Sequence, residues 1–236
     1  MITSIPKVLF VACFTVVVTA IMMLVAPLTP GATFDALARF YSRTILRVCG
    51  VKIVVRGREH VDFSQHYIYV ANHASLFDIP AVVAGIPDGI RIVYKRELNL
   101  IPFLGWAMKL TNRHIGIDRA RGLAAMRRLE EAIKRVITGA SLLLFAEGTR
   151  SPDGQLQTFK RGAFNLAVRT GIRVVPLTIV GSSSVLRKKS FRIVPGTITL
   201  ILDKPIEPKS AGGKAAELQL LEETRSVIKR HYIEKQ

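Results

Sequence analysis

The segment with the clearest potential for chemistry runs from residue 72 to residue 78 and reads NHASLFD. It follows a short β-branched and aromatic run, so we expect His73 at the end of a strand and Asp78 at the start of a helix. An acid in this position can hold one imidazole nitrogen and leave the other free to take a proton from a hydroxyl. The same two residues also fit a histidine that caps a helix and binds a nearby acid.

This pair comes without a nucleophile of its own. The segment GSSSV at 181–185 lacks the final glycine of a Gly-x-Ser-x-Gly turn, and neither Cys13 nor Cys49 has a neighbouring histidine. A nucleophile supplied by the substrate suits single-step acyl transfer from a thioester to an alcohol, without an acyl-enzyme. The remaining histidines show no metal-ligand spacing, so we expect no metal and no cofactor. They are His60, His66, His114 and His231.

A second charged segment, FAEGTRSP at 145–152, follows the most apolar internal run of the chain. The carboxyl edge of a sheet commonly carries ligand contacts. Here Gly148 allows close backbone approach, Arg150 offers a planar set of donors for phosphate oxygens, and Glu147 can orient that arginine. An ordinary charged turn closed by Ser-Pro-Asp-Gly explains the same residues.

A third charged segment, NRHIGIDR at 112–119, is typical of a short strand followed by a basic helix. Arg119, near the start of that helix, can share an anion with backbone N–H groups. It equally fits a solvated arginine balanced by Asp118. Other charges stand at the ends of expected elements, namely Lys95 with Glu97 and Lys160 with Arg161.

The elements that must position these residues alternate from residue 51 onward. Short β-branched runs separated by helical patterns predict an α/β fold, with one helix-covered mixed β-sheet over residues 51–236. The expected strands lie at 51–57, 66–72, 90–95, 141–147, 173–180 and 197–203. The expected helices lie near 76–86, 102–110, 120–138, 160–170 and 213–233.

Residues 1–50 are expected to form a separate N-terminal membrane anchor with an amphipathic helix. The stretch 8–28 has no charge, and as a helix it covers roughly the 30 Å of a bilayer core. It can span the bilayer or lie in one leaflet. A cleaved signal peptide is the alternative, but only Lys7 precedes the stretch and the nearest Ala-x-Ala, at 36–38, lies too far beyond it.

The stretch 34–50 combines an apolar arc with an opposite basic stripe. The arc holds Phe34, Leu37, Ala38, Tyr41, Ile45 and Val48, and the stripe holds Arg39, Arg43 and Arg47. Such a helix fits the headgroup layer of an anionic leaflet, and it also fits an amphipathic helix packed on the domain. Basic residues are denser after the apolar stretch than before it, which predicts a catalytic domain on the cytosolic side. In a bacterium this would be the inner or plasma membrane.

The net charge points to an anionic partner. Thirty-four Lys and Arg against seventeen Asp and Glu give a formal charge of +17 over 236 residues. The uncharged N-terminal stretch favours an anionic membrane surface, and no recognised nucleic-acid-binding module is present, so no nucleic-acid partner is expected.

Taken in order, these segments resemble the glycerolipid acyltransferase family that includes 1-acylglycerol-3-phosphate acyltransferases, over roughly residues 65–180. The segments that are similar to family motifs are Asn72-His73-x-Ser75-x-x-Asp78, Lys95-x-Glu97-Leu98, Ile117-Asp118-Arg119, Glu147-Gly148-Thr149-Arg150-Ser151, Phe159-Lys160-x-Gly162-Ala163-Phe164 and Val175-Pro176-Leu177. Two positions depart from the family pattern. Ala146 stands where a proline is usual, and Gly116 stands where an aromatic or bulky apolar residue is usual.

The resemblance implies that His73 is a general base, oriented by Asp78, in acyl transfer to the sn-2 hydroxyl of 1-acyl-sn-glycerol-3-phosphate. The implied donor is a thioester of acyl carrier protein or coenzyme A, and the acceptor is a lysophospholipid. The substrate-binding residues implied by the motifs are Asn72, Ser75, Lys95, Arg119, Glu147, Gly148, Thr149 and Arg150. Another lysolipid acceptor, such as a lyso-ornithine type, and a non-catalytic membrane-tethered binding protein are the alternatives.

Overall fold

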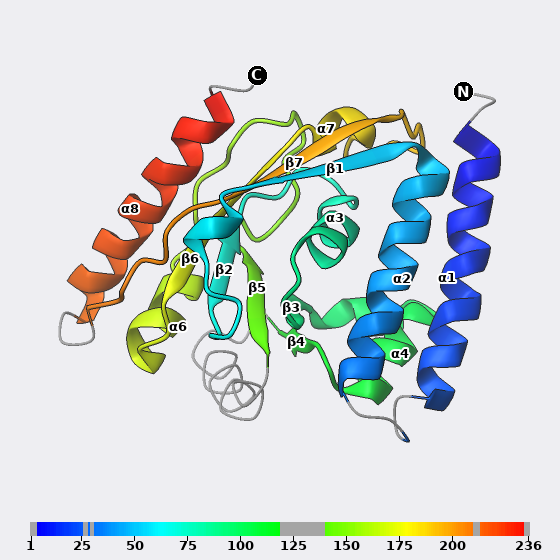
Figure 1. The fold of residues 1–236 in the computed structure, drawn as a ribbon, viewed down its shortest axis with the longest axis horizontal. Helices are drawn as coiled ribbons and strands as arrows, with labels where there is room; N and C mark the ends of the chain where they lie inside the picture. The colour runs from blue at the N-terminus through cyan, green and yellow to red at the C-terminus, as the bar shows by residue number, and fades with distance from the viewer. Residues whose placement is uncertain (1–3, 26–27, 29–30, 119–139, 210–212, 234–236) are drawn as a thin grey trace.

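A computed structural model describes the chain apart from residues 1–3, 26–27, 29–30, 119–139, 210–212 and 234–236 (Figure 1). The strands are β1 Val51–Arg56, β2 Ile68–Ala71, β3 Ile90–Lys95, β4 Ile115–Ile117, β5 Ser141–Phe145, β6 Val174–Val180 and β7 Gly196–Leu202. The α-helices are α1 Ile5–Val25, α2 Gly31–Cys49, α3 Asp78–Gly85, α4 Leu104–Thr111, α6 Gly162–Thr170, α7 Ser182–Val185 and α8 Gly213–Ile233. Two short 3₁₀ helices are η2 Arg58–His60 and η3 Arg96–Leu100.

The strands form one seven-stranded mixed sheet in the order β1-β7-β6-β2-β5-β3-β4. Among these seven described strands only the β6–β7 pair is antiparallel, so β7 and its parallel neighbour β1 run against the other five strands. The carboxyl ends of β6, β2, β5, β3 and β4 therefore meet at the same edge of the sheet, which is where ligands bind in most sheets of this kind.

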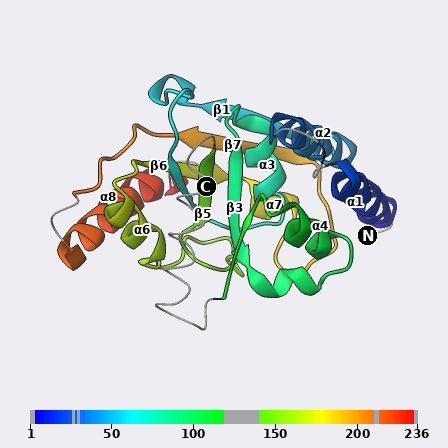
Figure 2. The same cartoon turned by 90° about the horizontal axis from the view of Figure 1, so that it is seen from below.

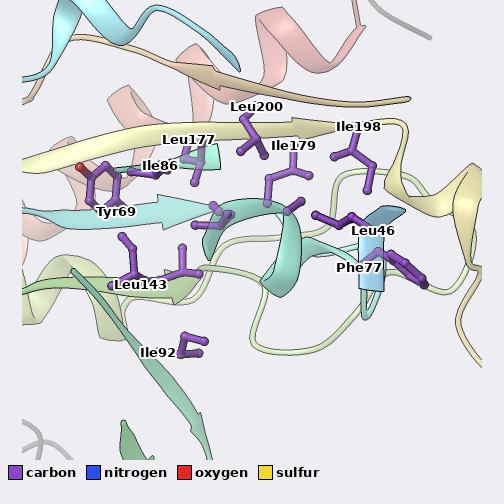
Figure 3. Packing of buried hydrophobic residues seen from close by; sticks show 14 of the residues in the cluster. Leu46, Tyr69, Phe77, Ile86, Ile92, Leu143, Leu177, Ile179, Ile198 and Leu200 are labelled. Carbon is purple, nitrogen blue, oxygen red and sulfur yellow. The ribbon is translucent and has the colours of Figure 1, made fainter. Parts of the chain in front are cut away.

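Helices cover both faces of the sheet. Successive residues of its central strands point to opposite faces, and both sets of residues are apolar. In β2, Tyr69 packs on the side of α2 and α3, whereas Ile68 and Val70 pack on the side of α6 and α8. Figure 3 shows the first of these cores, where Leu143 and Leu177 of the sheet lie near Ile86. The helix-covered mixed sheet predicted from the sequence is confirmed.

The predicted strands and helices reappear with ends shifted by a few residues, and the helix expected at 120–138 lies outside the described residues. The sequence did not predict η2, η3 or α7, because segments of three to five residues carry too little periodicity. These short helices form the turns that link longer elements.

The amphipathic helix α2 packs on the domain, which is the second of the two arrangements left open by its sequence. Its Phe34 and Tyr41 pack with Val18 and Met22 of α1. One member of the basic stripe, Arg39, donates to the carbonyl oxygen of Ile86 at the end of α3, at 3.3 Å. The apolar arc is therefore shared between α1 and the core of the domain, where Ile45 packs.

Helix α1 lies beside α2, at the end of the molecule remote from α8 (Figures 1 and 2). It is long and apolar enough to cross a membrane. Polar contacts bind its first turn to the domain: the Ser4 hydroxyl contacts the backbone of Ile193, and Lys7 Nζ donates to the Cys49 carbonyl oxygen at 3.1 Å. The helix is thus attached to the folded domain along its length.

Candidate active site

The two strongest sequence motifs meet at the carboxyl edge of the sheet. His73 follows β2, and Glu147 follows the neighbouring strand β5, which runs parallel to it. The two connections are joined by hydrogen bonds, including one from the Ser151 N–H to the His73 carbonyl oxygen at 2.8 Å. Strand pairing thus brings together residues that are 74 positions apart.

His73 and Asp78 form a hydrogen-bonded pair, the His73–Asp78 dyad, at the spacing expected from the sequence. The distance from His73 Nδ1 to Asp78 Oδ2 is 2.7 Å, and the same oxygen accepts the backbone N–H groups of Ala74 and Ser75 at 2.8 and 2.9 Å. Asp78 is fully buried and is the first residue of α3, where a helix favours negative charge. Three donors and the helix end therefore hold this carboxylate in place.

The arrangement fixes which imidazole nitrogen can act as a base. Because the carboxylate of Asp78 accepts a hydrogen bond from Nδ1, that nitrogen carries the proton and Nε2 keeps its lone pair. Nε2 has no hydrogen-bond partner among the described residues. The ring also stacks on Phe145, with centroids 3.9 Å apart and planes inclined by 18°. This contact sets the ring plane, and the side chain keeps 14% of its surface exposed.

Glu147 bonds to the backbone of His73 rather than orienting Arg150. Its Oε1 accepts the backbone N–H of His73 at 2.9 Å, and only 3% of the residue is exposed. Burial raises the pKa of Glu147 to about 7, against the opposing effect of the N–H groups of His73 and Gln157. Its second oxygen, Oε2, is buried without a partner in the described part of the chain. A proton on Glu147 would relieve the cost of that burial.

The raised pKa of Glu147 predicts that the stability of the fold depends on pH. Between pH 4.5 and about 7 the folded chain keeps the Glu147 proton that the unfolded chain has lost, so the free energy of unfolding falls as pH rises. We expect a decline of about 3 kcal/mol through this window, and Glu147→Gln should abolish that contribution. Unfolding midpoints at pH 5 and pH 8 would measure it. An unchanged pH dependence in Glu147→Gln, or an equal change in the exposed control Glu59→Gln, would contradict the assignment.

The turn after Glu147 gathers positive charge. Gly148 has φ 73°, which favours glycine, and a Cβ atom there would lie 3.0 Å from Lys160 Cδ. Lys188 Nζ donates to the Arg150 carbonyl oxygen at 2.5 Å and to the Thr149 hydroxyl at 3.3 Å. Arg150 has no ion-pair partner in the described part of the chain. Three basic side chains therefore surround a turn that is close to the dyad.

Lys188 lies in a basic run at 187–189. It is 38 residues away from Arg150 and belongs to no motif, so spacing alone does not connect the two. Its loop is placed by a buried hydrogen bond of 2.8 Å from the Ser75 hydroxyl to the Leu186 carbonyl oxygen. The loop after α7 is thus a third part of the site, next to those after β2 and β5.

Two residues predicted to bind substrate are used inside the protein. Asn72 is buried, and its amide group exchanges two hydrogen bonds of 2.8 Å with the backbone of Ile179 on β6. Ser75 is fully buried, and its hydroxyl donates to Leu186 and accepts from the N–H of Phe77. The geometry therefore corrects the prediction for these two side chains, because their polar groups are already bonded and out of reach of substrate.

The remaining predicted residues are placed less closely. Lys95 ends β3 at the same edge of the sheet, and its Nζ lies 3.0 Å from Glu97 Oε1 on the surface. Arg119 lies outside the described residues. Asp118, the last described residue before it, directly follows β4 and so stands at that edge as well.

Local packing explains both departures from the family pattern. The N–H of Ala146 donates to the Ala71 carbonyl oxygen at 3.0 Å, a hydrogen bond between the β2 and β5 segments that proline cannot make. At Gly116, a Cβ atom would lie 3.0 Å from the ring of Tyr94. That ring occupies the space of the missing side chain, and its hydroxyl donates to Asn99 at 2.8 Å.

Several known proteins are similar to this chain. A family model described as Acyltransferase matches residues 52–180. A 1-acyl-sn-glycerol-3-phosphate acyltransferase from Pseudomonas aeruginosa is 32% identical, over 82% of this chain and 77% of that protein. One from Limnanthes douglasii is 38% identical over 69% of this chain, and the match spans 57% of the plant protein, little more than half its length.

A solved structure is similar over almost the whole chain. The crystal structure of the 1-acyl-sn-glycerophosphate (LPA) acyltransferase PlsC from Thermotoga maritima superposes with a TM-score of 0.80 and 26% sequence identity. The superposition covers 98% of this chain and 95% of that chain.

Proposed function

The chain belongs to the Acyltransferase family, and on this premise we propose that it transfers a fatty acyl group from an acyl thioester to 1-acyl-sn-glycerol-3-phosphate. The product is phosphatidic acid, formed at the sn-2 hydroxyl. The observation that carries this proposal is the buried Asp78 carboxylate, bonded at 2.7 Å to His73 with Nε2 left open. Relatives named as 1-acyl-sn-glycerol-3-phosphate acyltransferases support the choice of acceptor.

In this mechanism His73 Nε2 takes the proton of the acceptor hydroxyl as the oxygen attacks the thioester carbonyl carbon. The carbon–sulfur bond then breaks, and the leaving thiolate receives the proton from the imidazolium. Asp78 keeps the Nδ1 proton in place and stabilises the positive ring between the two steps. No cofactor takes part, and acyl carrier protein or coenzyme A leaves as the free thiol.

Nearby serines support a nucleophile that comes from the substrate. Ser75 and Ser151 are the serines in the two connections that form the site, and both are buried. The Ser75 hydroxyl bonds to Leu186, and the Ser151 hydroxyl bonds to Asp153 at 2.8 Å. Neither hydroxyl is directed to His73, so transfer in one step, without an acyl-enzyme, fits this site best.

The acceptor phosphate is best placed at the basic turn. The missing side chain at Gly148 lets Lys160 lie against the backbone of the turn, and Arg150 supplies donors suited to phosphate oxygens. Lys160 adds charge beside Gly148, whereas its neighbour Arg161 is paired with Glu217 on α8. Thr149 and Arg119 are further candidates from the sequence motifs, and Lys95 is a candidate for the donor or the phosphate.

Lys188 is expected to position Arg150 for this phosphate. Lys188→Ala removes the hydrogen bond to the Arg150 carbonyl, so we expect the apparent KM for lysophosphatidic acid to rise about tenfold while kcat changes little. Steady-state kinetics in mixed micelles would show the split, and Lys188→Arg should restore part of the affinity. Arg187→Ala is the matched control for lost charge. An equal effect of Arg187→Ala, or a loss confined to kcat, would contradict this role.

The N-terminal helices support a reaction that takes place at a membrane. The contacts of Ser4 and Lys7 with the domain support an arrangement in which α1 lies along one leaflet rather than crossing the bilayer alone. The denser basic residues after α1 support a domain on the cytosolic side. Residues 1–50 would then act as the anchor, and residues 51–236 would carry the chemistry.

Complementation tests the proposed function in a cell. The chain would be expressed in a bacterium whose own 1-acylglycerol-3-phosphate acyltransferase can be switched off. We expect the chain to restore growth and phosphatidic acid, and His73→Ala to accumulate lysophosphatidic acid. Membrane-located protein that restores neither would overturn the proposal. If growth were restored and the acceptor consumed were a phosphate-free lysolipid, the chain would belong to another pathway.

A further inference from the structure

An unusual concentration of exposed apolar side chains lies on the segment from η3 to α4. Six large residues within thirteen positions are between 36% and 80% exposed, and together they define the η3–α4 patch: Leu98, Leu100, Ile101, Phe103, Trp106 and Leu110. Single exposed apolar residues are normal on a protein surface, but a contiguous group of this kind marks an interaction site.

The η3–α4 patch is a folded surface rather than a loose loop. A Cβ atom on Gly105 would lie 2.3 Å from the Leu98 carbonyl oxygen, so the glycine lets α4 sit directly against η3. Phe103 adopts φ 61°, a conformation that non-glycine residues rarely take. Its ring lies 5.4 Å from that of Trp106, while Ala107 on the opposite side of α4 is buried. The fold thus holds these aromatic side chains at the surface.

The patch continues onto the apolar surface of α1. Helix α4 packs against α1, and both views of the fold place the two helices together, at the side of the molecule away from α8 (Figures 1 and 2). The outward residues of α1 are themselves exposed and apolar, including Leu9, Phe10, Val17, Ile21 and Leu24. A surface that covered only one of the two helices would leave the exposed apolar side chains of the other helix in water.

Charge and residue type point to lipid as the occupant. Residues 95–110 carry three basic residues and one acid, and Lys109 stands beside Leu110. Tryptophan favours the headgroup region, and basic residues near it are attracted to anionic lipids. We propose that the η3–α4 patch is a second membrane-binding element, which inserts Trp106 and its apolar neighbours into the same anionic leaflet that receives α1.

This attachment would orient the site as well as hold the protein. Helix η3 begins directly after Lys95, the last residue of β3, at the sheet edge that carries His73 and Glu147. Two attachments, α1 and the patch, fix the rotation of the domain about the α1 axis. The carboxyl edge of the sheet is then held beside the leaflet in which an amphiphilic acceptor resides.

Trp106 is the only tryptophan in the chain, so its fluorescence reports on the patch without any substitution. The wild-type protein would be reconstituted into vesicles of phosphatidylcholine and phosphatidylglycerol, with and without lipids brominated on the upper part of the acyl chain. We expect brominated lipid to remove most of the emission and acrylamide in the water to remove little. Quenching by acrylamide but not by brominated lipid would overturn the proposal, and so would protection from both, which indicates a protein partner or a second copy.

Paired substitutions test whether the neighbours of Trp106 bring it into the lipid. Leu100→Ser with Leu110→Ser should reduce quenching by brominated lipid and increase quenching by acrylamide, with α1 intact. Leu218→Ser, an equally simple change at a 43% exposed leucine on α8, should alter neither. Unchanged quenching in the double variant would contradict a membrane contact made by the patch. Because acyl transfer is not measured, failure of the proposed function would leave these results interpretable.

Discussion

Replacing His73 by alanine is expected to lower kcat for phosphatidic acid formation by on the order of 10³-fold, the range that a general base contributes. The imidazole Nε2 is the only nitrogen of the dyad that is free to take the acceptor proton, since Nδ1 is bonded to Asp78 at 2.7 Å. The apparent KM for lysophosphatidic acid should change little, because the proposed phosphate contacts lie on the turn at 148–150. Steady-state rates with purified protein in mixed micelles would provide both values.

A matched substitution separates this loss from a general effect of removing histidine. His60 lies in η2, and its Nδ1 contacts the Leu202 carbonyl oxygen at 3.0 Å. This position follows β1, which runs against the central strands, so it lies at the sheet edge opposite His73. His60→Ala should therefore keep its rate. If His73→Ala kept more than about a tenth of the wild-type rate, general-base catalysis by this residue would be excluded.

Replacing Asp78 by asparagine is expected to cost nearly as much, on the order of 10²–10⁴-fold in kcat, although the two side chains have the same shape. A single oxygen, Oδ2, meets His73 Nδ1 and the N–H groups of Ala74 and Ser75, so an asparagine that keeps its amide oxygen there lacks the charge that stabilises the imidazolium. Its NH₂ group, if turned to His73, would donate to Nδ1 and move the ring proton to Nε2, which abolishes the base. The rate of phosphatidic acid formation would be compared with the thermal unfolding midpoint of the same preparation.

Asp88→Asn is the control for burying an amide in place of an acid. Asp88 accepts hydrogen bonds from Tyr69 and Ser141, near the start of β5 and remote from the dyad. Burial raises the pKa of Asp88, so a neutral amide is suited to this position. Activity should survive in Asp88→Asn and be lost in Asp78→Asn at comparable stability. Loss of activity only in proportion to unfolded protein would contradict an orienting role for Asp78.

The dyad and the sheet could be predicted from sequence because both depend on local patterns. His73 and Asp78 are five residues apart, so a strand end and a helix start are enough to bring them together. The strand residues Ile68 to Ala71 and Leu142 to Phe145 are apolar without interruption, which is typical of parallel strands buried on both faces. The fold class and the contact between His73 and Asp78 therefore follow from short segments.

Contacts between distant segments set the parts that the sequence did not predict. Glu147 meets the backbone of His73 only because β2 pairs with β5. Lys188 reaches Arg150 only because α7 and its loop return to the same edge of the sheet. Asn72 is predicted from the sequence to bind substrate, but its amide group is bonded to the backbone of Ile179 on β6. None of these pairings leaves a periodic signal in the chain.

The N-terminal region shows a different limit of sequence reasoning. An apolar arc on α2 has the same pattern whether it faces lipid or another helix, since both surroundings exclude water. In the structure Phe34 and Tyr41 pack with α1, which occupies the place that lipid would otherwise fill. The exposure of the apolar residues of η3 and α4 could not be predicted for the same reason. The sequence pattern alone does not distinguish an inward apolar residue from an outward one.

Acyl transfer by the purified, detergent-solubilised chain tests the central claim most directly. Acyl coenzyme A and acyl carrier protein would serve as donors to 1-acylglycerol-3-phosphate and to phosphate-free lysolipids, beside His73→Ala. The account predicts phosphatidic acid from the phosphorylated acceptor, and loss of that product in the variant. Transfer only to phosphate-free lysolipids, or equal product from His73→Ala, would contradict it.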